Sequence, residues 1–451
     1  MLIDKKSLGI LQDALQRLEE GFQGLPEFKP SVDTDNLRKV LLEVTERMQD
    51  NYPYPHPLYI GQMMKPPHPI AQLAYTLAMW INPNNHALDG GRASSVMEKE
   101  AVAELAKMFG WKAHLGHLCS GGTIANLEAL WIAGNLKPGK KVIASQQAHY
   151  THERICGVLR LPFDFVPCDS RARMDLDALE AMLTDGSIGT VVVTIGTTAT
   201  GSVDPLPEIL KLQSKYDFRI HADAAYGGFF ILVDNLDSET LSAFQCLSEV
   251  DSIVIDPHKH GLQPYGCGCI LFKDPAVGRF YKHDSPYTYF TSNELHLGEI
   301  SLECSRPGAA AVALWATQRL LPFVPGGKFA NDLSKSRKAA IRLFELLQND
   351  PRFVPTMTPE LDIVVWTPIA KSASKASFLS KAIFDAAASE NLHMALANLP
   401  RSLFADHWKR IQWNQDVVTC LRSCLMKPEH LDWIDHIWKA LDLATNKVLN
   451  K

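Results

Sequence analysis

The feature that most constrains the fold is an alternation of short apolar runs with helical patterns, which begins near residue 95. The apolar runs lie at residues 141–145, 190–195, 218–222, 252–255 and 269–272. Most are rich in valine and isoleucine and lack strict polar alternation, as expected for strands covered on both faces. Helical patterns fill the intervals, for example at residues 175–183 and 206–216. This alternation predicts the α/β class, with a mostly parallel sheet and helices on both sides.

The two ends of the chain have different patterns. Residues 4–22 carry leucines at helical spacing and predict an amphipathic helix. A proline-rich stretch at residues 52–69 follows. Because proline blocks helix formation, we expect an extended, packed path there, with a disordered linker as the alternative. In the last third, long helices are expected at residues 309–320 and 333–347, and a strand at 362–366 begins a smaller α+β part.

These differences predict three parts of the chain. An N-terminal helix and extended segment span residues 1–70, a large α/β domain spans 71–315, and a small C-terminal domain spans 316–451. Ligands of parallel α/β sheets bind at the carboxyl ends of the strands. The large domain is therefore the expected location of a ligand site.

Composition and charge argue against several classes of function. The formal net charge is −5, and no long run of Lys or Arg indicates a nucleic-acid partner. No stretch approaches about 18 apolar residues, and the charged start does not resemble a secretory signal, so we expect neither a membrane span nor export. Nine cysteines are scattered along the chain, and Cys267 and Cys269 have no second pair to complete a zinc site. We therefore predict mostly free thiols in a cytoplasmic protein, and no metal site.

A glycine-rich turn, Ser120-Gly-Gly-Thr123, precedes the helical run at residues 127–133. Gly121 and Gly122 let the backbone approach a ligand closely, and Thr123 adds a hydroxyl group. The free N–H groups and the dipole of the following helix favour an anion such as a phosphate. A plain turn in which Thr123 caps the helix explains this segment equally well when it is taken alone.

His149, in the segment Gln147-Ala-His-Tyr-Thr-His152, follows the apolar run at residues 141–145. An imidazole at a strand end can stack on a flat ring or move a proton. Taken alone, a structural or surface histidine is the better explanation. His152 is a weaker candidate for the same role.

Asp223 ends another apolar run, in His221-Ala-Asp-Ala-Ala-Tyr-Gly-Gly228. An unpaired carboxylate would be costly at such a position, so we expect a cationic partner, such as the protonated ring nitrogen of a ligand. Ala225, two residues further on, leaves room for a ring to lie flat. The alternative is an aspartate that caps a helix.

Lys259 closes the segment Asp256-Pro-His-Lys259, just after the apolar run at residues 252–255. Its amine can form an imine with an aldehyde. The alternative, a surface lysine in a loop, is weakened by the apolar runs on either side. Lys259 lies 36 residues after Asp223, which leaves room for one helix and one strand. We therefore expect these two side chains on neighbouring strands.

In this order and spacing, the four segments resemble the group II amino-acid decarboxylases that depend on pyridoxal 5′-phosphate (PLP). Asp-Pro-His-Lys259 is the most specific motif, and the resemblance covers roughly residues 56–428. The longer form that continues to Gly266, with Ser305-Arg-Pro-Gly308, is most similar to the archaeal and bacterial tyrosine/aspartate decarboxylase-like branch. The resemblance implies the PLP-dependent transferase fold of type I (the aspartate aminotransferase superfamily). That fold has a large domain with a mixed, mostly parallel seven-stranded sheet and a smaller C-terminal α+β domain.

The resemblance also implies a role for each matching residue, with PLP as the cofactor. The implied cofactor-binding residues are Gly121, Gly122, Thr123, His149, Thr198, Asp223, Ala225, His258 and Lys259. Lys259 would carry PLP as a Schiff base, Asp223 would pair with the ring nitrogen, and His149 would stack on the ring. These three are the implied catalytic residues. The glycine-rich turn and His258 would hold the phosphate.

Four further residues are implied to bind substrate. Gln62 matches a glutamine of the substrate pocket in the glutamate branch, and Arg422 matches an arginine that binds a substrate carboxylate there. Relatives with aromatic substrates also have this arginine. Tyr287 and Tyr289 are the nearest candidates for a protonating tyrosine, with packing at a subunit contact as the alternative. Asp256 replaces an asparagine that binds phosphate in many animal relatives, so it is not assigned to the phosphate unless its carboxylate pairs elsewhere.

The implied reaction converts a small-molecule L-amino acid into an amine and CO2. A homodimer is also implied, because sites of this superfamily lie at the subunit interface, and the N-terminal helix and proline-rich segment of residues 1–70 would then wrap the partner. Ser305-Arg-Pro-Gly308 also matches the sphingosine-phosphate lyases, and an aldehyde synthase reaction stays open as well. A PLP-binding protein without activity is a more distant alternative, since Lys259 and Asp223 are both present. Gln62 and Arg422 fit an acidic amino acid as substrate, and the tyrosines fit an aromatic one, so both substrate classes stay open.

Overall fold

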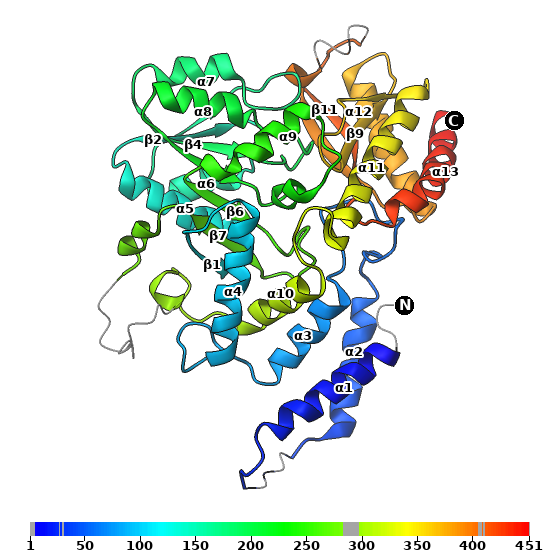
Figure 1. The fold of residues 1–451 in the computed structure, drawn as a ribbon. Helices are drawn as coiled ribbons and strands as arrows, with labels where there is room; N and C mark the ends of the chain where they lie inside the picture. The colour runs from blue at the N-terminus through cyan, green and yellow to red at the C-terminus, as the bar shows by residue number, and fades with distance from the viewer. Residues whose placement is uncertain are drawn as a thin grey trace.

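A seven-stranded sheet forms the centre of the large domain (Figure 1). The computed structural model describes residues 5–26, 28, 31–282, 297–404, 408 and 411–450. In sheet order the strands are β1 (Leu115–Cys119), β7 (Gly268–Phe272), β6 (Ser252–Ile255), β5 (Arg219–Asp223), β4 (Ile188–Thr194), β2 (Lys141–Ser145) and β3 (Phe163–Val166). Strand β7 runs antiparallel to β1 and β6, and all other pairings are parallel. The predicted mixed, mostly parallel sheet is confirmed.

Helices pack on both faces of this sheet. They are α4 (Arg92–Met108), α5 (Gly122–Leu136), α6 (Thr151–Leu159), α7 (Leu176–Leu183), α8 (Leu206–Lys215) and α9 (Ser238–Gln245), with short 3-10 helices at Gly228–Leu232, Cys246–Glu249, Pro275–Phe280 and Leu297–Glu299. Strand β4 is buried along its whole length, and its central run of three valines reflects this. Val191 and Val193 pack with Leu179 of α7 and Ile209 of α8, whereas Val192 packs with α5 on the opposite face. Alternate strand residues point to opposite faces, so two covered faces require an unbroken apolar run.

A four-stranded antiparallel sheet forms the smaller C-terminal domain, at the right of Figure 1. Its strands are β10 (Ala395–Pro400), β11 (Val417–Cys424), β9 (Ile363–Pro368) and β8 (Phe353–Pro355), with helices α11 (Lys328–Asn349), α12 (Ala373–Ser389) and α13 (His430–Leu449) and a 3-10 turn at Arg401–Leu403. Helix α10 (Gly308–Leu320) instead packs against α3 (Pro69–Met79) and α4. The domain boundaries at residues 70 and 315 stay a proposal.

The N-terminal part combines two projecting helices with a packed, proline-rich path. Helices α1 (Lys5–Glu20) and α2 (Thr34–Met48) extend away from the rest of the molecule at the bottom of Figure 1 and contain no buried residue. The proline-rich path lies along the small domain. Ile60 donates its N–H to the carbonyl of His393 at 2.9 Å and accepts one from Cys424 at 2.8 Å. The prediction of a packed segment, rather than a disordered linker, is confirmed.

Two strands of the large sheet were not predicted. In β1, Gly116 and His117 interrupt the apolar run, and His117 is nevertheless buried because its Nε2 contacts Glu128 at 2.9 Å. Strand β3 is a short edge strand in which Asp164 and Phe165 are exposed. Neither strand therefore has the continuous apolar pattern of the central strands.

Three further findings concern the chain as a whole. No helix in the described ranges is long and apolar enough to cross a membrane. All nine cysteines are free, and six of them are buried. Within the described part of the chain, no group of three or more His, Cys, Asp or Glu side chains could hold a metal ion.

A buried ion pair joins the loop before α10 to α4 and to the end of β1. Arg306, from the Ser305-Arg-Pro-Gly308 motif, places Nη1 2.7 Å from Oε1 of Glu98 and donates to the carbonyl of Leu118. Glu98 also accepts the N–H of Leu118 at 3.0 Å and the amide of Asn85 at 2.6 Å. Both charged side chains are at most 5% exposed, so the pair is desolvated and depends on its partners.

We expect Arg306→Met to lower the free energy of unfolding by about 3–5 kcal/mol, because it leaves the Glu98 carboxylate buried without its cation. The measurement is equilibrium urea unfolding of the purified protein. Arg319→Met is the matched control on α10, since Arg319 pairs with Glu100 at an exposed position and should cost less than about 1 kcal/mol. Equal losses in the two variants would contradict the structural role of Arg306.

Candidate active site

The carboxyl ends of five strands meet at one edge of the large sheet. Strands β1, β2, β4, β5 and β6 run in the same direction, and a cavity of about 360 Å3 opens where they end. It contains all the residues predicted to bind a cofactor: Gly121, Gly122, Thr123, His149, Thr198, Asp223, Ala225, His258 and Lys259. Segments far apart in the sequence therefore line one cavity.

The N-terminus of α5 forms one wall of this cavity. The helix begins at Gly122, directly after β1, and Gly121 caps it without a side-chain hydrogen bond. A Cβ atom on Gly122 would lie 2.6 Å from Oδ2 of Asp256, so this close approach requires glycine. Thr123 is not the helix cap, and its Oγ1 lies 3.4 Å from the hydroxyl of Thr151. The open N–H groups of the first turn are suited to an anion such as a phosphate.

Asp223 is the last residue of β5, and its partner is His152 of α6. His152 Nε2 lies 2.9 Å from Asp223 Oδ2, and both side chains are buried. Burial alone would raise the pKa of Asp223, but the hydrogen bond from His152 and the nearby charges hold it well below its ordinary value. Asp223 is therefore a permanent carboxylate at neutral pH. It suits a cationic group of a ligand, as expected from the sequence.

Lys259 lies in the turn after β6, beside Asp256. Its Nζ is 3.2 Å from Asp256 Oδ2, which is also 3.5 Å from Nε2 of His258. His258 Nδ1 is 2.9 Å from the carbonyl of Cys267, and burial lowers the pKa of this imidazole. The carboxylate of Asp256 thus pairs with the ammonium of Lys259. Because its negative charge is paired, Asp256 can lie close to a site for an anion such as a phosphate.

His149 follows β2 and borders the cavity. Burial lowers the pKa of His149, so its imidazole is neutral at neutral pH. The N–H of Thr151 donates to Nδ1 at 3.3 Å, which leaves the ring hydrogen on Nε2. The ring also packs on Tyr150, with ring centres 4.4 Å apart.

Arg422 and Gln62 do not line this cavity, but Arg422 contacts the loop that does, and Gln62 contacts Arg422. Arg422, on β11, donates from Nη2 to the carbonyl of Thr198 at 2.7 Å and from Nε to that of Ala199 at 3.2 Å. Its Nη1 lies 3.4 Å from Oε1 of Gln62. The small domain therefore holds the backbone beside Thr198.

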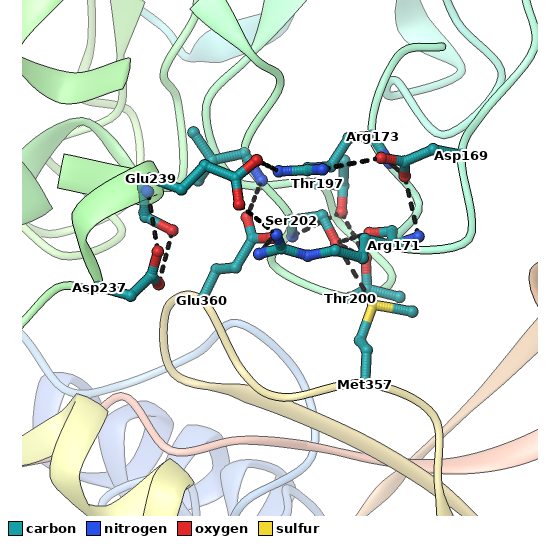
Figure 2. Close-up of polar contacts among 12 residues, drawn as sticks. Asp169, Arg171, Arg173, Thr197, Thr200, Ser202, Asp237, Glu239, Met357 and Glu360 are labelled. Atoms are coloured by element: carbon teal, nitrogen blue, oxygen red, sulfur yellow. Dashed lines mark hydrogen bonds and ion pairs between the residues drawn. The ribbon is translucent and has the colours of Figure 1, made fainter. Parts of the chain in front are cut away.

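Figure 2 shows further polar contacts that support the same loop. The hydroxyl groups of Thr197, Thr200 and Ser202 form a chain with links of 2.8 Å, and Ser202 donates to the carbonyl of Arg171 at 2.7 Å. The guanidinium of Arg171 in turn contacts the carboxylate of Glu360 at 2.5 Å. Glu360 precedes β9, so this contact also joins the loop to the small domain.

Several cavity residues were not predicted as site residues, and two candidates cannot be placed. Asp256 and Tyr265 line the cavity; the sequence assigns neither a role, although Tyr265 lies in the longer decarboxylase-like motif. His152, only a weaker candidate from the sequence, does not line the cavity but contacts Asp223 from the first turn of α6, which begins two residues after His149. The positions 287 and 289, both tyrosines, lie outside the described residues.

The cavity matches the three reactive parts of one cofactor. A helix N-terminus suits a phosphate, the carboxylate of Asp223 suits a protonated ring nitrogen, and the amine of Lys259 suits an aldehyde. PLP carries all three groups on one ring, so the residues present fit this cofactor. The fold and the cavity together define a PLP-dependent enzyme of fold type I.

Comparisons with known proteins identify the family. Residues 15–367 match the pyridoxal-dependent decarboxylase conserved domain, and the chain belongs to this family. An L-tyrosine decarboxylase of Enterococcus faecium is 29% identical over 432 residues, covering 73% of this chain and 70% of that protein. An L-aspartate decarboxylase of Thermococcus kodakarensis is 31% identical over 288 residues, covering 63% of this chain and 73% of that protein. The chain is thus a PLP-dependent amino-acid carboxy-lyase, and the predicted bacterial and archaeal branch is confirmed.

Solved structures show the same fold at lower identity. The crystal structure of mouse CSAD has a TM-score of 0.78 at 20% identity, covering 95% of this chain and 92% of that chain. The structure of Oryza sativa TDC with PLP and tryptamine also has a TM-score of 0.78, at 16% identity, covering 99% of this chain and 97% of that chain. The predicted fold class is confirmed across nearly the whole chain.

We expect His152→Phe to weaken PLP retention by about 10- to 100-fold, because Asp223 loses a hydrogen bond to its buried charge, worth about 1.5–3 kcal/mol. The measurement is PLP dissociation followed by absorbance during dialysis. His152→Gln, which keeps a donor, should recover part of the loss. His436→Phe on the exposed face of α13 is the control, and PLP retention in His152→Phe equal to this control would contradict the role of His152.

Proposed function

We propose that this enzyme decarboxylates an L-amino acid to the corresponding amine and CO2, with Lys259 as the amine that carries PLP. The observation that carries the proposal is the position of Lys259 and Asp223 in one cavity, at the ends of the adjacent strands β5 and β6. A lysine for the aldehyde and a carboxylate for the ring nitrogen are the two protein groups that this chemistry needs.

PLP supplies an electron sink for the pair of electrons left on Cα when the carboxylate departs. Asp223 supports this function because its low pKa keeps it ionised, so that it can hold a proton on the ring nitrogen. The first turn of α5 would bind the phosphate, with His258 beside it. Thr198 and Ala225 border the space left for the ring.

His149 is proposed to orient the substrate and to move a proton. Its Nδ1 accepts a backbone N–H, so the hydrogen on Nε2 is available for the departing carboxylate group. A water molecule held by the imidazole can then give a proton to Cα, and the hydroxide that is left regains a proton from solvent. The bond that breaks must stand perpendicular to the cofactor ring, so a group that holds the carboxylate selects the reaction.

Among the amino acids, we propose L-tyrosine ahead of L-aspartate as the substrate. Arg422 already donates two hydrogen bonds to the backbone of residues 198 and 199, so it is committed to positioning the loop rather than to a second substrate carboxylate. Tyr226 and Tyr265 line the cavity and offer aromatic surface. The relatives named L-tyrosine decarboxylase are matched over 432 and 429 residues, the L-aspartate decarboxylase over 288.

We expect the wild-type enzyme to release one CO2 and one amine per substrate, fastest with L-tyrosine, and Lys259→Ala to abolish both turnover and the visible absorbance of lysine-bound PLP. The measurement is CO2 and amine release across the twenty amino acids, cysteine sulfinate and diaminobutyrate. Lys273→Ala, at a half-exposed lysine after β7, is the control.

Other products would contradict this reaction. An aldehyde with ammonia and peroxide would indicate an aldehyde synthase, and an aldehyde with a phosphorylated amine would indicate a carbon–carbon lyase. No turnover of any amino acid by a PLP-loaded wild type would support a non-catalytic PLP-binding protein. Faster release from L-aspartate would reverse the proposed order of substrates without affecting the role of Lys259.

We propose that the enzyme is a homodimer in which α1 and α2 pack on a second copy of the chain. The exposed large apolar residues of α2 are Leu37, Val40, Leu41, Leu42, Val44 and Met48. Most share one side of the helix at spacings of three and four. An apolar face of this kind is costly in water unless it is covered. Because both helices extend away from their own chain (Figure 1), a second copy can cover them.

We expect Leu41→Asp combined with Val44→Asp to shift the protein from dimer to monomer, because two carboxylates would have to be buried at the contact. The measurement is size-exclusion chromatography with light scattering. Lys39→Asp, on the polar side of the same helix, should leave the dimer intact. A wild-type monomer at micromolar concentration would overturn the proposal.

A cytoplasmic location is also proposed. All nine cysteines are free thiols, and Cys304 is exposed as well as free. Reducing compartments keep exposed thiols in this state, whereas oxidising compartments favour disulfides.

A further inference from the structure

A second cavity, of about 430 Å3, lies away from the cofactor site. It is enclosed by the proline-rich segment, the start of α11 and the turn before α13. Its lining shares no residue with the cofactor cavity. Its volume lies in the range of small-molecule sites, about 300–1,000 Å3. None of its lining residues has a part in the proposed decarboxylation.

Three lysines line this cavity, and two of them, Lys65 and Lys427, bind backbone carbonyl groups rather than carboxylates. Lys427 Nζ donates to the carbonyl of Tyr59 at 2.7 Å, and Lys65 Nζ donates to the carbonyl of Met426 at 3.2 Å. Lys427 is only 4% exposed. In the part of the chain that the structure describes, neither lysine forms an ion pair with a carboxylate. Each ammonium has three N–H donors and gives one to a carbonyl, so N–H groups remain for a ligand.

Nearby carboxylates compensate these charges only in part. Against the effect of burial, Asp362, Glu429 and Asp332 raise the pKa of Lys65 and Glu429 raises that of Lys427, but none of these described carboxylates forms an ion pair with either lysine. Asp332 pairs with Lys328 and with Lys335. Glu429 is exposed to solvent. Burial lowers the pKa of Lys65 to about 8, and burial together with the charge of Lys65 lowers that of Lys427 to about 7. The positive charges of two desolvated amines repel each other. An anion between them would remove this repulsion and stabilise both ammonium groups.

A buried imidazole adds a further open polar atom. His260 lines this cavity and is fully buried, whereas its neighbour Lys259 lines the cofactor cavity. His260 Nε2 lies 3.4 Å from Asp362, but no described group forms a hydrogen bond with Nδ1. Buried polar atoms normally have a partner, so this one indicates space for a ligand or a water.

Most of the remaining lining is apolar, apart from His68 and Ser336. Leu262, Leu321, Phe329 and Leu333 contribute side chains, and six prolines complete the apolar part of the wall. A bare inorganic ion would leave this surface uncovered. An aliphatic or aromatic body attached to the anionic group would cover it and gain binding free energy from the area removed from water.

We propose that this cavity binds a small organic anion, with its phosphate or carboxylate group between Lys65 and Lys427 and its apolar body against the leucine and phenylalanine side chains. This is a second small-molecule site of the enzyme, separate from the PLP site. It does not depend on which amino acid the enzyme decarboxylates.

The test is isothermal titration of the PLP-loaded enzyme in buffer free of phosphate and carboxylates. The probes are butyl phosphate, pentanoate, inorganic phosphate and butanol. We expect saturable binding of one butyl phosphate or pentanoate per chain, weaker binding of inorganic phosphate, and none of butanol. Whichever of the first two binds tighter identifies the anionic group. No saturable binding of either at millimolar concentration would overturn the proposal.

Lysine variants locate the binding. Lys65→Met and Lys427→Met should each weaken the tighter probe by about tenfold or more, because each removes a charge-assisted hydrogen bond. Lys211→Met is the matched control, at a lysine whose side chain is 78% exposed. Unchanged affinity in both cavity variants would contradict the assignment.

Thermal melting provides an independent check on folding. In anion-free buffer, Lys427→Met should melt no lower than the wild type, because it removes an uncompensated buried charge. The probe should then raise the melting temperature of the wild type and of Lys211→Met, but not that of Lys427→Met. If Lys427→Met does not fold, Lys65→Met, at a less enclosed lysine, decides the question. Stabilisation of the cavity variants equal to that of the wild type would contradict the proposal.

Discussion

The parallel pairing of β4, β5 and β6 is the constraint on which the rest of the site depends. Thr194 of β4 pairs with Asp223 of β5, and Asp223 pairs with Val254 of β6. Paired strands lie about 4.8 Å apart, so the segments that follow them begin within the width of one aromatic ring. The turn that holds Lys259 therefore starts beside Asp223, without any long loop to bring the two together.

The two cavities differ in how their charges are balanced. In the cofactor cavity, each buried carboxylate has a basic partner: His152 lies beside Asp223, and Lys259 beside Asp256. This balance keeps Asp223 ionised and ready for a cation on the ligand. In the second cavity, Lys65 and Lys427 form no ion pair with a carboxylate among the described residues, which is why an anionic ligand is expected there. Net charge alone, −5 for the chain, reveals neither arrangement.

Much of the fold could be predicted because its signals are local. The strands at 141–145 and 252–255 have the predicted bounds, and those of the other predicted strands shift by only one or two residues. Strand β1 could not be predicted, because its buried His117 depends on a partner, Glu128, that lies eleven residues away on another element. The edge strand β3 is half exposed, and Asp164 interrupts its apolar residues.

The sequence by itself determined which chemistry is available at the strand ends. A glycine-rich turn before a helix, an aspartate that ends a strand and a lysine after the next strand are readable from order and spacing. Only the tertiary structure decided the partners of these groups. His152 and Asp223 are 71 residues apart, and Arg422 reaches across 224 residues to Thr198. Hydrogen bonds and ion pairs act over a few ångströms, so they follow from how the elements pack, and no local pattern encodes them.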